Sequence, residues 1–444
     1  MKKAQQMTPG DDSGRQMSKL RLYGLLSASV LMVAYFFVYF HRMTGGAISD
    51  ILESHYGVDA AGVGILASAY LYSYMVMQIP SGLITDRFGP RRSAAVFVTI
   101  LSFGSLLCAV SAMDGVRNFG LMVLGRTIIG IGASVISIPY MKIFISWFPK
   151  DRFSTLIGIA VMIGNIGAIC AAYPMVMAID GIGLAETYMW LTAITFAIAF
   201  SIWLFVRDSP SDRGLPEMTE LHPEDYGEVE VSEERIPMTR SVAMVFGEKA
   251  FWPAAIWLFL IYGAFMVWGG AFSGSFYGES GMAKEDYSMV LMFVGVGMLT
   301  GAPLSGFISD RTPLGERHLI LSATIGLLAV WSAICLTSGD ASVVTDIPVQ
   351  CVLNYLLGLF TSVFVVTFAL IKSHYPYSIS GVVAASLNLF PFLGGAVCTT
   401  AAGFLIGNGT VADYRAVWWA CLAMVIAAMA VAVYIFYRTR TNKQ

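Results

Sequence analysis

Long apolar segments separated by short polar stretches dominate the pattern of the chain. Each segment holds about 20 residues or more, which is the length that a helix rising about 1.5 Å per residue needs to cross a bilayer core of roughly 30 Å. The pattern therefore predicts twelve membrane-spanning helices. They lie near residues 22–48, 59–84, 93–112, 118–144, 154–178, 186–206, 251–277, 287–308, 318–337, 347–371, 379–406 and 414–437.

One polar stretch is much longer than the others. It is rich in Glu, Asp and Pro and separates the sixth apolar segment from the seventh. It is too short and too polar to form a domain of its own, so it is interpreted as a linker. The predicted units are a tail at 1–21, a six-helix bundle at 22–206, the linker at 207–249, a second six-helix bundle at 250–438 and a tail at 439–444.

Composition agrees with a membrane protein. The 444 residues are 57% hydrophobic and 13% charged, whereas an ordinary soluble domain has about a quarter of its residues charged. A net charge of −2 argues against a nucleic-acid partner. The six cysteines fall within apolar segments without metal-ligand spacing, so neither a metal site nor a cofactor is predicted.

The distribution of basic residues predicts the orientation in the membrane. With the N-terminus inside, the outer loops hold only Arg117, Lys284 and Arg415, and most of the other basic residues fall in inner segments. This is the positive-inside pattern. We therefore expect both termini in the cytoplasm and a multi-pass protein of the cytoplasmic membrane, with lipid as a partner.

The first apolar segment carries a cation at Arg42, directly after His41. An arginine in hydrocarbon costs at least about 2.5 kcal/mol and cannot shed its proton, so it must face protein, water or an anion. Its planar guanidinium suits a carboxylate, sulfonate or phosphate, because it can donate two parallel hydrogen bonds. The simpler interpretation is an arginine that reaches the outer interface or pairs with a neighbouring helix.

The second segment offers partners for such a site. Tyr70, Tyr74 and Gln78 are spaced four residues apart and are expected to share one helix face, although the tyrosines can equally be packing residues. His41 is the candidate for proton coupling, because a histidine can change charge near neutral pH. A histidine merely packed against a neighbouring helix is at least as good an interpretation.

Further intramembrane polar residues complete the candidate set. Arg126 is expected to bond to backbone carbonyls or to take part in coupling. The remaining candidates for the cavity wall, each of which can instead bond to another helix, are Asn165, Trp268, Ser273, Ser275, Tyr277, Asn388 and Phe390.

The two halves of the chain echo each other. Gly82-Leu-Ile-Thr-Asp86-Arg87-Phe-Gly89-Pro-Arg91-Arg92 follows the second segment, and Gly306-Phe-Ile-Ser-Asp310-Arg311 follows the eighth. The first stretch resembles the cytoplasmic signature of the major facilitator superfamily. With the twelve segments, the linker and the second copy, this resemblance covers the whole chain. It implies the all-α major facilitator fold of two pseudo-symmetric six-helix bundles. It also implies a transporter that works by alternating access, and no enzymatic activity is expected.

The charged residues of the two copies suit a latch at the cytoplasmic face, because the glycines allow tight helix contact there. We assign this gating role, rather than substrate binding, to Asp86, Arg87, Arg91, Asp310 and Arg311.

The local pattern resembles two branches of the superfamily, the anion:cation symporters and the organophosphate permeases. In these families a first-helix arginine and a second-helix tyrosine meet the anion, which implies this role for Arg42 and Tyr74, and Lys142 matches a basic anchor. The chain also departs from the families. His41 and Ala133 stand where symporters carry acidic residues, and residues 251–277 lack the second arginine of the permeases.

The sequence thus predicts a monomeric carrier that takes up a small organic anion by proton or sodium symport, or in exchange for a counter-anion. Two other functions stay open. A proton-coupled exporter of hydrophobic or cationic compounds would be favoured by an acidic residue in the cavity, and a transporter-like sensor by tight binding without flux.

Overall fold

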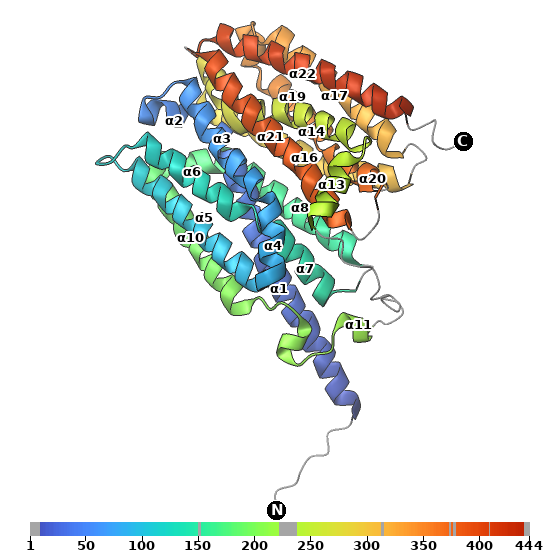
Figure 1. Ribbon diagram of the computed structural model, residues 1–444. Coiled ribbons are helices and arrows are strands. Elements are labelled where there is room, and N and C mark those ends of the chain that lie inside the picture. The colour runs from blue at the N-terminus through green and yellow to red at the C-terminus, as the bar shows by residue number, and fades with distance from the viewer. Residues whose placement is uncertain are drawn as a thin grey trace, which may run out of the picture.

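The structure is a computed structural model that describes residues 9–149, 152–221, 238–311, 315–372, 374–375, 379–407 and 409–438. The described residues form helices joined by turns, with no strand among them. Two bundles of helices lie side by side, joined through the linker region (Figure 1). The predicted all-α fold of two six-helix bundles is confirmed, while the residue boundaries predicted for the bundles stay predictions.

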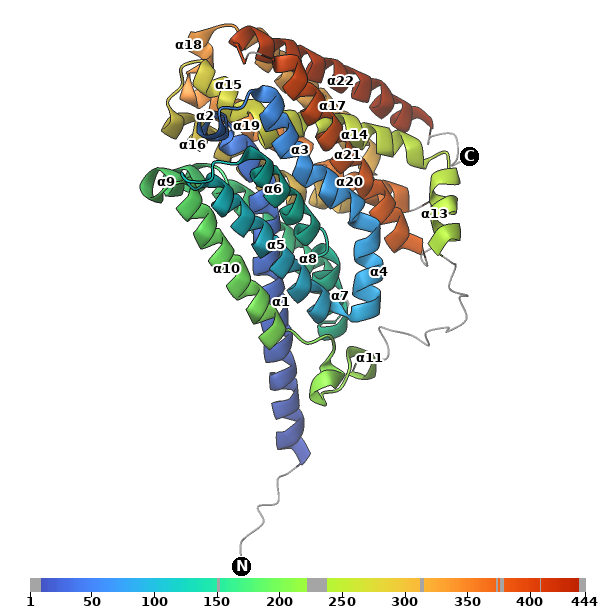
Figure 2. The same cartoon turned by 60° about the vertical axis from the view of Figure 1, so that its left-hand side comes forward.

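The first bundle holds the helices up to residue 205. They are α1 (Pro9–Ala47), α2 (Ser49–Tyr56), α3 (Ala60–Val76), α4 (Gln78–Phe88), α5 (Pro90–Ala112), α6 (Phe119–Ala133), α7 (Ser137–Trp147), α8 (Phe153–Cys170), α9 (Tyr173–Ile182) and α10 (Leu184–Phe205). Helix α1 begins earlier than the apolar segment predicts, and its first turns extend beyond the bundle (Figure 2).

The second bundle follows the linker. In the linker the described elements are the 3-10 helix η2 (Pro210–Arg213), α11 (Met218–Leu221) and α13 (Met238–Gly247). The second bundle consists of α14 (Phe251–Val267), the π-helix η3 (Trp268–Phe272), α15 (Ser273–Glu279), α16 (Lys284–Arg311), α17 (Gly315–Thr337), α18 (Ala341–Val344), α19 (Ile347–Thr361), α20 (Phe364–Lys372), α21 (Ser380–Ile406) and α22 (Val411–Arg438).

Ten helical runs of the described chain are long and apolar enough to cross a membrane, and there are twelve if two bent pairs each count as one span. The bent pairs are α3 with α4, at 54°, and α8 with α9, at 44°. A proline follows each break, at Pro80 and Pro174, and a proline lacks the N–H that would continue the helical ladder. The sequence predicts one spanning segment at 59–84 and one at 154–178, and in the structure each of them is bent. As a consequence, Tyr70 and Tyr74 share α3, whereas Gln78 begins α4.

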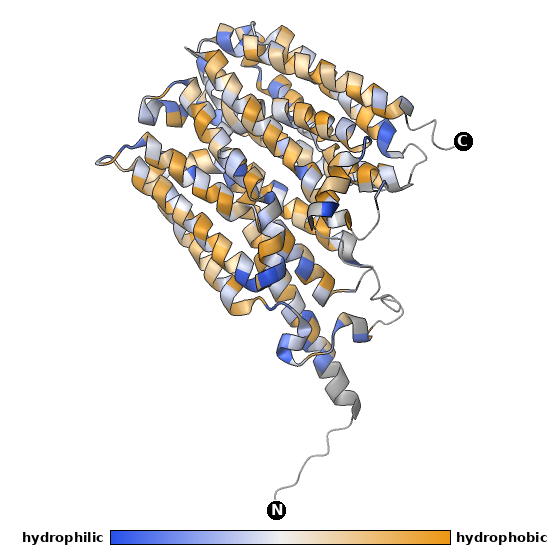
Figure 3. Cartoon of the chain, viewed as in Figure 1, coloured by the Kyte–Doolittle hydropathy of each residue, from blue (hydrophilic) through white to orange (hydrophobic). Residues whose placement is uncertain are grey.

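Apolar side chains cover the outside of the bundles. Orange, the colour of hydrophobic residues, predominates along the helices in Figure 3, and blue gathers near helix ends and in the linker. Large apolar side chains such as Trp190 and Phe200 on α10 and Tyr437 on α22 are more than 60% exposed. So much exposed apolar surface suits contact with hydrocarbon rather than with water.

The bundles meet along a few helix pairs. Helix α3 packs against α21, α8 packs against α16, and α1 packs against η3. Following the orientation that the sequence predicts, we call the end where α1 begins and α22 finishes the inner end, and the end where α1 meets α2 the outer end. The candidate site lies at this interface.

Candidate functional site

The Arg42 guanidinium lies between the two bundles. The side chain is only 6% exposed, and the guanidinium carbon lies 4.5 Å from the ring centre of Tyr39, 5.1 Å from that of Tyr74 and 4.9 Å from that of Phe392. Tyr39 belongs to α1 and Tyr74 to α3, whereas Phe392 belongs to α21 of the second bundle. A cation over ring faces is attracted by their electron density. Arg42 therefore contacts both bundles at once.

In the part of the chain that the structure describes, no carboxylate neutralises this cation. Among the described residues, no ion pair includes Arg42, and its Nε has no hydrogen-bond partner. Instead, the side chains of Tyr70, Tyr74 and Tyr262 lie close to the guanidinium. A buried cation without a counter-charge is costly, and ring faces and hydroxyl dipoles offset only part of that cost. The arrangement therefore favours an incoming anion.

Tyr70 and Tyr74 stack on one face of α3, with ring centres 5.9 Å apart. The Tyr70 hydroxyl donates a hydrogen bond of 3.1 Å to the backbone carbonyl of Val38, so it ties α3 to α1. The Tyr74 ring lies 4.3 Å from the Phe392 ring. Of the two, Tyr74 lies at the contact between the bundles, and Tyr70 lies behind it.

Gln78 and Asn388 join the bundles directly. The Asn388 amide nitrogen donates a hydrogen bond of 3.1 Å to Gln78 Oε1. The other half of the Gln78 amide, Nε2, is buried without a hydrogen-bond partner. Arg42, Tyr74, Gln78 and Asn388, which the sequence predicts as substrate contacts, are thus brought to one region of the interface.

Arg126 on α6 is the second buried arginine of the first bundle, at 1% exposure. Its Nη1 donates a hydrogen bond of 2.7 Å to the backbone carbonyl of His41, and its guanidinium lies 5.3 Å from the Tyr70 ring centre. The His41 side chain is fully buried, and neither ring nitrogen has a hydrogen-bond partner. Arg126 thus bonds to a backbone carbonyl, while the predicted coupling roles of His41 and Arg126 stay predictions.

Trp268 and Tyr277 bond within the second bundle. Trp268 Nε1 donates to Asn354 Oδ1 over 2.9 Å, and Asn354 Nδ2 donates to the Tyr277 hydroxyl over 2.8 Å. The Tyr277 hydroxyl in turn donates to Gln350 Oε1 over 2.9 Å. Both predicted wall residues therefore have their polar groups occupied by α19. Asn165 on α8 is 2% exposed, and its Oδ1 has no partner.

Several site residues do not stand out in the sequence. Tyr39 lies three residues before Arg42, a helical spacing that places it on the same face, so its contact could have been predicted. Phe392 and Tyr262 come from the second bundle, and no local pattern links them to Arg42. Gln350 and Asn354 are four residues apart in an apolar segment, which was the available signal for their network.

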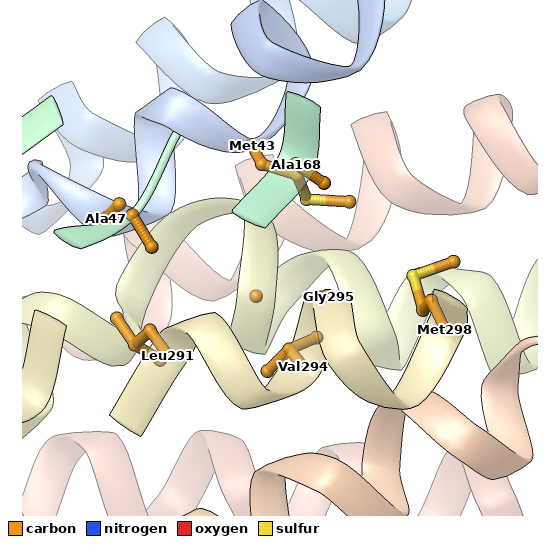
Figure 4. A pocket seen from close by; sticks show the side chains of 9 residues that line it. Met43, Ala47, Ala168, Leu291, Val294, Gly295 and Met298 are labelled. Atoms are coloured by element: carbon orange, nitrogen blue, oxygen red, sulfur yellow. The ribbon is translucent and has the colours of Figure 1, made fainter. Parts of the chain in front are cut away.

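A small apolar pocket lies nearby between α1, η3, α16 and the α8–α9 region (Figure 4). Its lining residues share one property, the absence of any polar or charged side chain. They are Met43, Ala47, Ala168, Ala172, Gly269, Leu291, Val294, Gly295 and Met298. This pocket can hold an apolar group, but it offers nothing to bind a charge.

The bundles are in close contact at the outer end. A Cβ added at Gly46 would lie 2.5 Å from the backbone oxygen of Gly269. The Ser275 N–H donates to Ser49 Oγ over 3.0 Å, and the Ser275 hydroxyl donates to Glu53 Oε1 over 2.9 Å. These contacts join α1 and α2 to η3 and α15, and they close the outer side of the interface.

The predicted latch residues lie at the inner end. Asp86 forms an ion pair with Lys142 of α7, within the first bundle. Arg91 donates through its backbone N–H to Asp208 over 2.6 Å and through its side chain to the Trp203 carbonyl over 2.6 and 2.9 Å.

The other predicted latch residues are Arg87, Asp310 and Arg311. The Arg87 guanidinium lies over the neighbouring Phe88 ring, 5.4 Å from its centre. The side chains of Asp310 and Arg311 lie outside the described part of the structure. The gating role assigned to these five residues therefore stays a prediction.

Two packed helical bundles that span a membrane, with a buried basic site at their interface, are the architecture of a membrane transport protein. The model of the Major Facilitator Superfamily matches residues 31–313 and 274–444. The chain belongs to this family, whose members and fold are those of membrane transporters rather than enzymes.

Several of the similar curated proteins are transporters of anions, and a quinolone resistance transporter of Acinetobacter baumannii is 22% identical over 39% of this chain and 41% of its own length. A probable sulfoacetate transporter of Cupriavidus necator is 22% identical over 44% of this chain and 45% of its own length. A hexuronate transporter of Escherichia coli is 24% identical over 74% of this chain and 71% of its own length. The chain thus spans less than half of the length of the sulfoacetate transporter and 71% of the length of the hexuronate transporter. The predicted resemblance to the anion-transporting branches is confirmed.

Solved structures show the same fold. A bacterial homolog of the human lysosomal transporter Spinster, inward-facing and unoccupied, aligns with a TM-score of 0.73 and 15% identity over 93% of this chain and 97% of that chain. A D-xylose–proton symporter aligns with a TM-score of 0.67 and 17% identity over 92% of this chain and 97% of that chain.

Proposed function

We propose that this protein is a secondary active transporter that moves a small organic anion across the cytoplasmic membrane by alternating access. The observation that carries the proposal is Arg42, a cation buried between the two bundles with no carboxylate partner among the described residues. A carboxylate, sulfonate or phosphate ester would supply the missing counter-charge. The substrates named for several of the similar proteins, sulfoacetate and hexuronate among them, are anions of this kind.

The neighbouring side chains suit this role. The planar guanidinium can hold two oxygens of the anion, and the Tyr74 hydroxyl and the unpaired Gln78 Nε2 can donate to others. Gln78 and Asn388 come from opposite bundles, so an anion held by both helices contacts both sides of the interface. A ligand bound in this way can bias the relative position of the bundles, which is what alternating access requires.

The direction we propose is uptake, by ion-coupled symport or by anion exchange, with both termini in the cytoplasm. His41 is the proposed proton site if the coupling ion is a proton, because it is a buried imidazole directly before Arg42 in α1. Sodium or a counter-anion are the other proposed coupling partners, and the carrier is proposed to work as a monomer.

Thermal stabilisation of the purified protein tests the proposal. A ligand that binds the folded state raises the apparent melting temperature by mass action. The panel consists of small carboxylates, sulfonates, phosphate esters and cationic drugs, applied to the wild type, to Arg42→Gln and to the control Arg117→Gln. Arg117 is an exposed arginine that pairs with Asp114 on a loop.

We expect one class of anion to stabilise the wild type and the control but not Arg42→Gln. Equal stabilisation of Arg42→Gln, or no response to any anion, contradicts the proposal. Stabilisation by cationic drugs alone would favour an exporter, and stabilisation without flux would favour a sensor.

A further inference from the structure

Two side-chain pairs cross from one bundle to the other about one helical turn apart. The rings of Tyr74 and Phe392 lie 4.3 Å apart, and the amides of Gln78 and Asn388 are joined by a hydrogen bond of 3.1 Å. Each bundle contributes two residues that are four positions apart, Tyr74 and Gln78 from the first bundle and Asn388 and Phe392 from the second. Helices α3 and α21 lie side by side along this contact (Figure 2).

Arg42 rests on the aromatic pair. Its guanidinium carbon lies 5.1 Å from the Tyr74 ring centre and 4.9 Å from the Phe392 ring centre. The amide pair lies toward the inner end, because α4 continues from Gln78 to the inner loop and α21 begins there. From Arg42 toward the inner end, the interface is therefore crossed first by two rings and then by two amides.

We propose that Phe392 is a positioning residue that senses the anion. In the empty carrier it holds the Arg42 cation across the interface, and an anion on Arg42 weakens this contact and loosens both pairs, so that they act as an inner gate. The inference rests on the proposed function, because it requires Arg42 to be the anion site.

The physical basis is competition for one positive charge. The attraction between a guanidinium and a ring face is electrostatic, so it falls when a bound anion neutralises the guanidinium. Phe392 is 4% exposed and has no polar atom with which to bind the anion itself, so only its ring face contributes. Tyr74 differs, because its hydroxyl can remain with the anion after the ring contact weakens.

This competition predicts that shortening Phe392 raises the affinity for the anion, which is the opposite of the usual effect of such a change in a binding site. A residue that merely lines a binding site loses affinity when it is shortened. Phe392 opposes the anion, so replacing its ring by an aliphatic side chain of similar volume should tighten binding. Phe364→Leu is the matched control, because Phe364 contacts Tyr262, with ring centres 5.7 Å apart, and makes no ring contact with Arg42.

The experiment measures the dissociation constant of the anion that stabilises the wild type. We expect Phe392→Leu to lower the constant about three- to tenfold, and Phe364→Leu to leave it within about twofold. Trifluorinated phenylalanine at position 392 keeps the shape and weakens the ring's negative face, so it should lower the constant as well, and it serves if Phe392→Leu does not fold. An unchanged or raised dissociation constant in either variant overturns the inference.

A cross-linking experiment tests the gate itself. Gln78→Cys with Asn388→Cys, in a background without the native cysteines, places two thiols at the amide pair. We expect oxidation to cross-link the empty carrier and a saturating concentration of the anion to slow this reaction. The double variant lacks the Gln78 amide, a proposed contact of the anion, so its dissociation constant for the anion is measured first and the anion is applied well above it. A missing cross-link in the empty carrier, or a rate that the bound anion does not change, overturns the gate.

The two proposals fail in different ways. If the anion still binds Arg42→Gln as well as the wild type, the proposed function itself is wrong. If Arg42→Gln abolishes binding but the variants at position 392 do not bind more tightly, only the role of Phe392 is wrong.

Discussion

Arg126 Nη1 and the backbone carbonyl of His41 are joined by a hydrogen bond of 2.7 Å, which connects α6 to α1 one residue before Arg42. Two buried arginines of one bundle thus differ in their contacts. Arg126 donates a hydrogen bond to a backbone carbonyl of α1, the helix that carries Arg42. Arg42 instead lies over aromatic rings of both bundles and has no ionic partner among the described residues.

This difference predicts that the two arginines affect the stability of the protein differently. Arg126→Gln removes a charge-assisted hydrogen bond within the bundle, and we expect it to destabilise the protein by about 2 kcal/mol. Arg42→Gln removes a buried charge without a counter-ion, so the empty protein should keep or raise its melting temperature. Melting curves of both variants without added anion check this. A loss of stability in Arg42→Gln as large as in Arg126→Gln would contradict the assignment.

Gly46 allows the two bundles to pack closely at the outer end, because it has no side chain. A Cβ at this position would lie 2.5 Å from the Gly269 carbonyl oxygen, so Gly46→Ala should prevent outer closure. We expect a folded protein that binds the anion but transports it slowly, because the bundles cannot close behind the substrate. The control is Gly158→Ala, since nothing lies within 4 Å of a Cβ added there. Transport by Gly46→Ala at the rate of the control would show that outer closure does not need this contact.

Glu53 gives the outer contact a dependence on pH. Burial raises the pKa of its carboxyl from 4.5 to about 7, and the nearby carboxylates of Asp50, Glu279 and Asp59 add to the shift against the opposing hydrogen bond from Ser275. Near neutral pH, the Glu53 carboxyl in the closed contact is therefore protonated to a larger extent than a carboxyl exposed to water, whose pKa is 4.5.

The closed outer end should accordingly become more stable as the pH falls from about 8 to about 6. Melting temperatures of the wild type and Glu53→Gln across this range check the sign. The variant, which cannot titrate at this position, should show the smaller pH dependence. An equal slope in both proteins would remove Glu53 from the explanation.

The ion pair between Asp86 and Lys142 is exposed at the inner end, with side-chain exposures of 66% and 35%. Exposed pairs contribute only about 0–1 kcal/mol, so Lys142→Gln should change the melting temperature little. If the pair acts as a latch, transport should fall nonetheless, and the exchange of the two charges in Asp86→Lys with Lys142→Asp should restore part of it. Uptake assays of the single and double variants measure this. A single variant that transports like the wild type would leave the pair a surface ion pair only.

Much of the fold is predictable from the sequence because segment length determines whether a helix can cross a bilayer. The same pattern cannot locate the bends, because apolar residues continue through them, although Pro80 and Pro174 were the available signals. Helix α14 shows a second limit. It is apolar on all sides, so no periodicity of its sequence reveals which of its residues face the other bundle.

The site was predictable where charge or local spacing carried the signal. Arg42 stood out because a cation in an apolar segment is costly, and Tyr74 followed from the resemblance to anion carriers. Phe392 and Tyr262 could not be assigned, since their contact with Arg42 depends on how the bundles dock. Trp268 was predicted to line the cavity, but its indole N–H is bonded to Asn354 within the second bundle. The sequence does not distinguish an aromatic residue that lines a cavity from one that packs inside a bundle.

Uptake into proteoliposomes is the most direct test that Arg42 binds the transported anion. The radiolabelled anion that stabilises the purified wild type is offered outside vesicles that contain the wild type, Arg42→Gln or Arg117→Gln. We predict accumulation with the wild type and with Arg117→Gln, and none above empty vesicles with Arg42→Gln. Accumulation with Arg42→Gln at the wild-type rate would contradict the central role of Arg42, and efflux from loaded vesicles without any uptake would contradict the proposed direction.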